Sequence, residues 1–572
     1  MTILIANIGT SDLSIKVDEY YFPVGFDRSE PNIDDLGLTD NEKNVWEQEL
    51  RQSYITTLLC PELGININEK GKFSFRELTL KILQSYQQDE EFWHHRIRPC
   101  RIWGVIKAAM QPKYGVTKAY IFVTDQPVTE KQGYPSDSIH LFEILQKWFQ
   151  REIPDLILKK ELIPHYIPAN DQDQLLNYYY QFFNQIDREE TVLISLKGGT
   201  PQMQTSLNIQ AIASGTAKQL FINPKLSIQK VLAGEPSECL MTSYWRYMRS
   251  QRYQTVKLLL ETRWDFDGAQ QILQDWKKVI NFLINEKVAD EAIVLQSKKI
   301  LEQIIQALEL GLDFLNLDYE SAGKILRENP QLTQATDLDS SIITHGDEKL
   351  LNLYTQSRIY WEIDQMANFL ARISSFYEEV LERLVFIFKG ENYFQGDWEL
   401  NTALVRYKMG ESLWQEFYNA EEKYNFELKS HNFNKKPIFK LKGRFTQRNF
   451  LEKLLVPHHN IPTSQWELML ESLKNLDFWV TQRNYLIHSA SGVSKKRMQE
   501  LLDNSLKKGL SESIVACKPG KIRSVMAKIC SSELGIVRSA YHLKFVGQNA
   551  DFYLYSDIRN FVLDQLQIES SK

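Results

Sequence analysis

The strongest constraint on the fold is a series of short apolar runs that each end in a small or polar turn, with amphipathic stretches between them. The three clearest runs span residues 2–8, 119–124 and 191–196, and weaker ones span 220–223 and 228–233. Helical patterns lie at 140–149, 173–185 and 203–212. Apolar strands that alternate with helices predict an α/β domain with a mostly parallel sheet.

The strand pattern fades after about residue 244, and apolar residues then recur at three- and four-residue spacing. The clearest helical stretches are residues 254–261, 268–286, 290–310 and 361–388. We therefore expect an α/β domain over 1–245, a helical linker region over 246–345 and a mainly α-helical domain over 346–572. Residues 16–111 are too long for one crossover, so we interpret them as an insertion with helices at 40–59 and 75–86.

Composition excludes several classes of protein. The chain has 572 residues, of which 43% are hydrophobic and 24% charged, as in ordinary globular proteins. No stretch approaches the roughly 18 apolar residues of a membrane span, and the N-terminus lacks a signal-peptide pattern. The five cysteines are scattered without a CxxC pair, which argues against a zinc or redox site. We expect a cytoplasmic protein without a bound metal.

Charge is distributed unevenly along the chain. Residues 430–572 hold 22 Lys+Arg against 12 Asp+Glu, whereas the whole chain has a net charge of −6. A basic end on an acidic chain suggests a polyanion site there, although a solvated basic surface is the commoner meaning of such a bias.

Small polar residues and glycines follow the three clearest strands. Residues 197–203 (KGGTPQM) combine glycines for close backbone approach with a threonine–proline helix start, where backbone N–H groups favour an anion. The carboxyl ends of parallel strands share one edge of a sheet, where ligands bind. The candidate ligand-binding residues are Gly9, Thr10, Ser11, Asp12, Thr124, Asp125, Gln126, Lys197, Gly198, Gly199, Thr200, Gln202 and Met203. Ordinary capped turns remain an alternative.

A second constellation, Arg483, Asn484 and His488, closes an amphipathic helix in the basic part of the chain. Arginine stabilises a charged phosphate bidentately, and histidine exchanges protons near neutral pH. Together they suffice for metal-free RNA cleavage by the 2′-hydroxyl. The spacing alone is weak evidence, because Arg538 and His542 form a similar pair by chance.

These motifs resemble those of CARF–HEPN ribonucleases of type III CRISPR systems. The Gly9-Thr10-Ser11 loop, together with Lys197, Gly199, Thr200 and Met203, resembles the signatures of CARF domains, which are Rossmann-like sensors. Arg483 and His488 match the Arg-x4–6-His signature of HEPN domains. The two signatures cover only a small part of the chain, and Pro201 departs from the basic residue that many relatives carry.

The resemblance implies an endoribonuclease of antiviral defence that is activated allosterically by cyclic oligoadenylate and needs no metal. It implies catalysis by Arg483 and His488 with help from Asn484, and products with 2′,3′-cyclic phosphate and 5′-hydroxyl ends. The expected partners are single-stranded RNA, a cyclic oligoadenylate, with tetra-adenylate favoured over hexa-adenylate, and a second copy of the chain in a homodimer. Slow cleavage of the activator beside Ser11 and Lys197 is a further expectation.

Two other classes of protein stay open. The chain could be a non-enzymatic cyclic-nucleotide sensor whose helical half binds a partner, with Arg483 and His488 in structural roles. It could also be a small-molecule enzyme on a Rossmann-like sheet, which the missing GxGxxG fingerprint disfavours.

Overall fold

The computed structural model describes residues 2–24, 51–68, 73–225, 227–336, 346–396, 398–424, 439–441, 443–488, 492–507 and 516–570. The chain forms two compact units. The sheet unit contains Met1–Arg252 and Gln274–Lys299, and the helical unit contains Tyr253–Leu273 and Ile300–Lys572. Helices α10 (Trp245–Arg263), α11 (Phe266–Glu286) and α12 (Glu291–Asn316) contribute residues to both units, so the predicted linker region 246–345 is divided between them.

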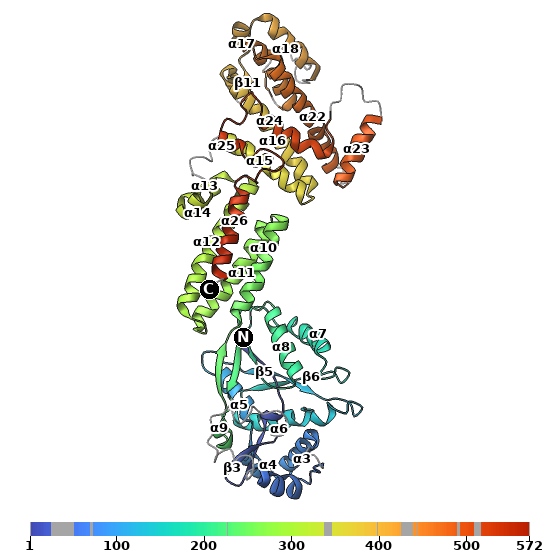
Figure 1. Ribbon diagram of the computed structural model, residues 1–572, viewed down its shortest axis with the longest axis vertical. Coiled ribbons are helices and arrows are strands. Elements are labelled where there is room, and N and C mark those ends of the chain that lie inside the picture. The colour runs from blue at the N-terminus through green and yellow to red at the C-terminus, as the bar shows by residue number, and fades with distance from the viewer. Residues whose placement is uncertain are drawn as a thin grey trace, which may run out of the picture. The chain divides into compact units, whose positions relative to one another are not determined.

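The sheet unit is built on a six-stranded sheet of order β6-β5-β1-β7-β8-β9. Figure 1 labels β5 and β6 of this sheet. Every neighbouring pair is parallel except β8 and β9. The strands are β1 (Thr2–Asn7), β5 (Lys118–Thr124), β6 (Ile157–Ile163), β7 (Thr191–Ser195), β8 (Gln219–Lys225) and β9 (Glu238–Thr242). The mostly parallel α/β sheet predicted from the sequence is confirmed.

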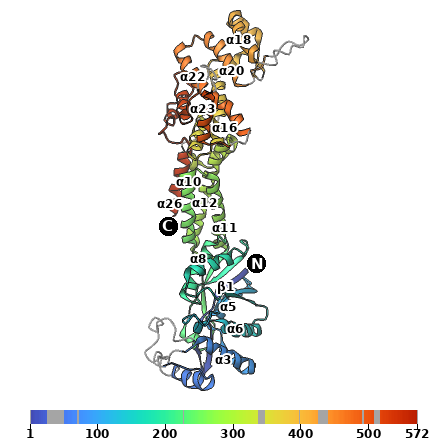
Figure 2. The ribbon, with the colours of Figure 1, turned by 90° about the vertical axis from the view of Figure 1, so that its right-hand side faces the viewer.

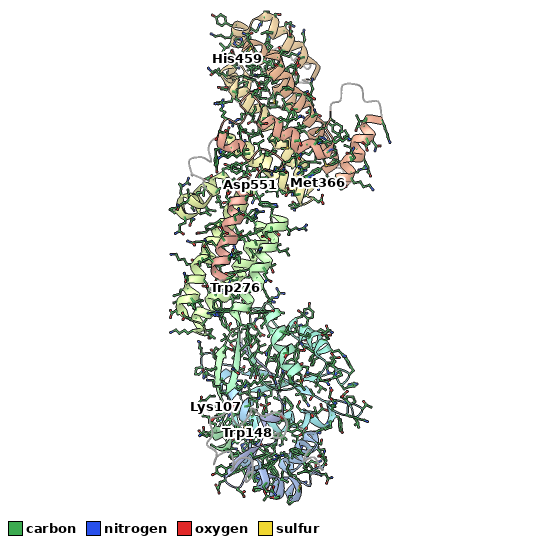
Figure 3. All side chains as sticks on the ribbon, in the orientation of Figure 1. Lys107, Trp148, Trp276, Met366, His459 and Asp551 are labelled. Atoms are coloured by element: carbon green, nitrogen blue, oxygen red, sulfur yellow. The ribbon has the colours of Figure 1, made fainter. Side chains whose placement is uncertain are left out.

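Helices cover both faces of this sheet, which explains why its central strands are apolar throughout. On one face α7 (Gln172–Phe183) and α8 (Pro201–Ala213) pack against each other and on the strands through a cluster that includes Phe122, Tyr179 and Leu207. The other face is covered by α5 (Cys100–Ala109) and α6 (Ile139–Glu152). Trp148 of α6, labelled in Figure 3, is fully buried and lies edge-on to Trp103 of α5.

The predicted insertion carries its own secondary structure. A small antiparallel sheet joins β2 (Ser14–Val17) to β3 (Tyr20–Pro23) and β4 (Ile97–Arg98). Its helical segments are α2 (Arg51–Ser53), the π-helical stretch η5 (Tyr54–Glu62), α3 (Phe75–Gln88) and α4 (Glu90–Arg96). The helix predicted at 75–86 is confirmed as α3, and residues 40–50 of the other predicted helix lie outside the described residues.

Some strand predictions were wrong or incomplete. Residues 228–233 were expected to form a strand, but Ile228–Leu232 is the short helix α9. Strands β6 and β9 were not predicted. Both lie at an edge of the sheet, so they lack the two buried flanks of a central strand. The sequence of β6, ILKKELI, accordingly has a run of charged residues at its centre, and only Ile163 is buried.

The helical unit confirms the mainly α-helical C-terminal half. Its centre is α16 (Met366–Ile387), which packs between α15 (Gly346–Glu362) and α22 (Thr463–His488), as Figure 2 shows for α16 and α22. The other helices are α13 (Tyr319–Glu328), α14 (Pro330–Thr336), α17 (Thr402–Met409), α18 (Glu411–Tyr424), α20 (Arg444–Phe450), α21 (Val456–His458), α23 (Lys495–Lys507), α24 (Ile522–Cys530), α25 (Ala540–Leu543) and α26 (Tyr555–Ser570). The short pieces are η8 (Gly390–Tyr393), β10 (Phe394–Gly396), β11 (Glu399–Leu400), η9 (Leu451–Leu455) and η10 (Pro519–Lys521).

Buried aromatic and aliphatic side chains hold the helical unit together. Phe376, Leu384 and Trp479 belong to one continuous cluster contributed by α16, α22 and their neighbours. Among the described residues, no helix combines the length and the apolar character that a membrane crossing requires.

Candidate ligand pocket and candidate catalytic motif

A pocket of about 320 Å³ opens at the carboxyl edge of the parallel sheet. Three of its walls are the segments that follow β1, β5 and β7, which the sequence had singled out. The predicted residues that line it are Gly9, Thr10, Thr124, Gln126, Gly199, Thr200 and Met203. The structure therefore brings together at one cavity residues that are nearly 200 positions apart in the sequence.

Glycines allow the β1 and β7 loops to pack backbone against backbone. Gly198 and Gly199 have φ angles of 115° and 70°, which disfavour other residues. A Cβ atom on Gly198 would lie 2.2 Å from the Asn7 carbonyl oxygen, and one on Gly9 would lie 3.0 Å from the Gly199 nitrogen. The two loops thus form one continuous floor on which a ligand can approach the backbone closely.

Thr200 begins helix α8 and faces the pocket. Its hydroxyl accepts from the Met203 N–H at 3.2 Å and donates to the Ala169 carbonyl oxygen at 2.5 Å. The first turn of α8, with Pro201 at its first position, therefore opens into the cavity. The positive end of the helix dipole favours an anion there.

A buried arginine that the sequence analysis missed holds these loops in place. Arg101, from the first turn of α5, is fully buried and donates to the Lys197 carbonyl oxygen, to the Asn7 carbonyl oxygen at 3.2 Å and to the Ser195 hydroxyl at 3.4 Å. It also forms an ion pair with Asp12. One guanidinium group thus joins the ends of β1 and β7. Its signal in the sequence is an arginine at a core position of a mostly apolar helix.

Asp12 was predicted to bind the ligand, but it lies behind the loop that lines the pocket. It is fully buried and does not line the pocket, and its carboxylate accepts from Arg101 and from the Gly9 N–H at 2.7 Å. Burial raises the pKa of the Asp12 carboxyl, against the opposing effect of Arg101. Asp12 supports the ligand-facing loop from behind.

The β5 end of the pocket is tied to its neighbours in the same way. The Gln126 side chain donates to the Ile167 carbonyl oxygen at 3.0 Å and accepts from the Ala169 N–H at 3.2 Å. Thr124 and Ser138 exchange hydrogen bonds at 3.0 and 3.2 Å. The polar groups of Thr124 and Gln126 therefore hold the pocket wall as well as lining it.

The rest of the wall comes from segments that the sequence analysis did not select. It consists of Gln132, Gly133, Ser136, Asp137 and Ser138 before α6, and Ala169 and Asn170 after β6. Asp137 accepts from the Gln126 N–H at 2.7 Å and pairs with Arg76 at 2.7 Å, and burial raises its pKa. Because β6 itself was not predicted, the loop that follows it could not be placed at this edge.

Six of the predicted residues lie outside the lining of the pocket: Ser11, Asp12, Asp125, Lys197, Gly198 and Gln202. Asp125 pairs with Arg76 at 2.7 Å. The Lys197 side chain is exposed at the end of β7. The position of Ser11 gives no support to cleavage of a bound ligand at this residue.

The second motif lies at the end of α22, which runs to His488. Arg483 is half-buried, and its Nε atom makes no hydrogen bond to any residue that the structure describes. The side chains of Asn484 and His488 lie outside the described residues. Arg483 thus offers a guanidinium group without a carboxylate partner within the described part of the chain.

The competing pair, Arg538 and His542, lies in an acidic environment. Asp347 accepts from the Arg538 N–H at 2.9 Å and pairs with Arg383, and Glu348 lies 3.4 Å from His542 Nε2. His542 is only 7% exposed, and burial lowers its pKa. Carboxylates next to His542 disfavour a bound anion at this pair.

The fold and the pocket define an α/β protein with a cavity at the carboxyl edge of a mostly parallel sheet and with a helical second half. No protein-family model matches the chain, and no curated protein matches it. Among solved structures, the chain is similar to Enterococcus italicus Csm6 bound to cyclic hexa-2′-fluoro-hexa-dAMP, with a TM-score of 0.46 and 13% sequence identity. That alignment covers 99% of this chain and 100% of the Csm6 chain.

The buried Asp12–Arg101 pair yields a stability prediction. We expect Asp12→Asn to lower the free energy of unfolding by about 3–5 kcal/mol, because it leaves the Arg101 charge buried without a partner. The double variant Asp12→Leu/Arg101→Met should lose less unfolding free energy than Asp12→Asn, because it leaves no unpaired buried charge. Asp125→Asn is the matched control. The Asp125 side chain is 40% exposed, so this variant should lower the free energy of unfolding by less than about 1 kcal/mol. Equal losses for Asp12→Asn and Asp125→Asn in urea denaturation would contradict this role.

Proposed function

We propose that the chain is a CARF–HEPN endoribonuclease of type III CRISPR defence, which cleaves single-stranded RNA without a metal when a cyclic oligoadenylate binds to the sheet unit. The observation that carries this proposal is the strand-end pocket. Residues from both signatures that resemble CARF domains, Gly9 and Thr10 from one and Gly199, Thr200 and Met203 from the other, line the same cavity.

The chemistry of the pocket fits an anionic ligand that also has polar ribose and base atoms. The start of α8 supplies a positive dipole end, and the glycine floor allows a phosphate to approach backbone N–H groups. Lys197 adds an exposed cation at the end of β7. Hydroxyl and carboxylate groups of the lining segment before α6, such as those of Ser136 and Asp137, are suited to hydrogen bonds with ribose and base atoms.

For the helical unit we propose general acid–base cleavage of RNA. The 2′-hydroxyl oxygen attacks the adjacent phosphorus as its proton leaves, and the 5′-oxygen departs after taking up a proton. His488 holds or moves these protons, and Arg483 stabilises the charge that develops on the phosphate oxygens. Asn484 orients one of these groups. The chemistry as proposed requires no metal.

The catalytic assignment predicts the behaviour of two variants. Arg483→Ala and His488→Ala should each abolish cleavage of a fluorogenic RNA, a loss of at least about 100-fold for a residue that transfers a proton. Binding of cyclic oligoadenylate should be unchanged. Addition of a chelator should have no effect. Full activity in His488→Ala, or strict dependence on a divalent ion, would contradict the mechanism, and binding of the activator without cleavage by wild type would favour the non-enzymatic sensor.

The sensor assignment predicts how the activator binds. Thr200→Ala and Lys197→Ala should weaken the binding of cyclic tetra-adenylate in isothermal titration, and Lys197→Ala should also make binding less dependent on salt because one phosphate contact is lost. Lys218, a partly exposed lysine that pairs with Glu189 just before β8 at the opposite edge of the sheet, provides the control. Unchanged affinity in both test variants would rule out this site. Titration with cyclic hexa-adenylate decides the preferred ring size.

We further propose that the active form is a two-fold homodimer. A ring of adenylates is rotationally symmetric, and one sheet unit offers it a single edge, so two copies would bind one ring from both sides. The same dimer would place two copies of Arg483 and His488 around one phosphate, and the ligand would act by favouring the competent dimer. Adding inactive His488→Ala subunits to wild type should then reduce activity beyond simple dilution. A strictly linear decrease would contradict shared sites.

A further inference from the structure

Two arginines of α20 are anchored to α22 close to the proposed catalytic motif. Arg444 donates from Nε to Asp477 at 2.8 Å and from an Nη atom to the Thr481 hydroxyl at 2.9 Å. Arg448 donates to the other oxygen of Asp477 at 3.2 Å and to the Tyr377 hydroxyl at 3.3 Å. All these contacts lie within the helical unit, and none is explained by the proposed reaction.

This cluster carries excess positive charge. Arg444 and Arg448 share the single carboxylate of Asp477, so these three side chains together have a net charge of about +1. The Arg444 and Asp477 side chains are 18% and 17% exposed, so water screens the charge less than on an open surface. A partly buried cationic site whose side chains are already fixed by hydrogen bonds favours the binding of a polyanion.

The helical register relates this cluster to the catalytic motif. Positions 477, 481, 484 and 488 of α22 are separated by four, three and four residues, which places them on one face of the helix. From Thr481 to His488 the helix rises by roughly 10 Å. Arg444 is bound at Thr481, so its guanidinium lies on the face that carries positions 484 and 488, about two turns before the end of the helix.

We propose that Arg444 and Phe445 form a binding site for the RNA strand beside the scissile phosphate. The inference rests on the proposed ribonuclease function. The bound group would be a backbone phosphate next to the one that is cleaved, held by Arg444, while Asp477 and Thr481 fix the orientation of the guanidinium. Arg444 is a binding residue, because it does not touch the reacting atoms.

Phe445 adds a surface for a base. Its side chain is 40% exposed, and the Arg444 Cζ atom lies 4.6 Å from the centre of its ring. An aromatic ring next to an arginine is the combination on which proteins stack the bases of single-stranded nucleic acids without sequence preference. The pair therefore fits a flexible single strand better than a rigid duplex.

The test measures the binding of a 2′-O-methyl single-stranded oligonucleotide to the full chain by fluorescence anisotropy. This probe has no free 2′-hydroxyl and cannot be cleaved by the proposed chemistry. We expect Arg444→Gln to weaken binding by about tenfold and to lower the slope of log K against log salt by about 0.7, the value of one phosphate contact on a single strand. Phe445→Ala should weaken binding by about tenfold without changing the slope.

Arg406 provides the matched control. It pairs with Glu411 through two hydrogen bonds of 2.8 Å, and Arg406→Gln removes the same charge from α17 instead of α20. This variant should bind the probe like wild type. Arg444→Lys should retain the salt slope, and Phe445→Trp should retain affinity. Thermal melting of each variant separates loss of binding from loss of fold. With cleavable RNA, Arg444→Gln should raise KM and leave kcat at saturation unchanged.

The outcomes separate this inference from the proposed function. Unchanged affinity and slope in Arg444→Gln, with unchanged affinity in Phe445→Ala, would overturn the site, and so would an equal effect of Arg406→Gln. If the probe binds through Arg444 and Phe445 but ordinary RNA remains intact, the RNA site stands and the ribonuclease function fails. If wild type does not bind the probe, the site is overturned as well.

Discussion

The buried ion pair between Arg101 and Asp12 is the interaction on which the ligand pocket depends. A parallel sheet leaves the ends of β1 and β7 side by side, but nothing in the sheet itself determines the path of the loops that follow. Arg101 binds carbonyl oxygens at both strand ends and also the carboxylate that supports Gly9. Removing a guanidinium and its carboxylate from water is costly, and the hydrogen bonds of Arg101 to Asp12, to two carbonyl oxygens and to the Ser195 hydroxyl offset part of that cost. These contacts therefore connect the loops that follow β1 and β7.

The sequence predicted the central part of the sheet unit because its strands are uniformly apolar and end in recognisable turns. β1, β5 and β7 are buried on both faces, so their sequences carry a strong signal that is independent of the rest of the chain. β6 and β9 are edge strands, and their polar residues resemble those of loops. Without β6, the wall at Ala169 and Asn170 could not be placed.

The same contrast holds for the side chains of the pocket. Gly9, Gly199 and Thr200 were predictable because each has a local reason to be at a strand end, either close approach or helix capping. Arg101 was missed because its role arises only when α5, far from both loops in the sequence, folds over them. Asp12 was expected to face a ligand because short polar residues usually do so in such loops, yet its carboxylate turns inward toward that arginine.

The position of Arg101 next to Cys100 ties the pocket to the far side of α5. The Cys100 carbonyl oxygen accepts from the Ser237 N–H at 3.4 Å, and Gly104 lies so close to Ser237 that an added Cβ would be only 2.2 Å from its carbonyl oxygen. Ser237 precedes β9, and β9 leads into α10. Helix α5 therefore contacts the pocket loops through Arg101 and the segment before β9 through Cys100 and Gly104.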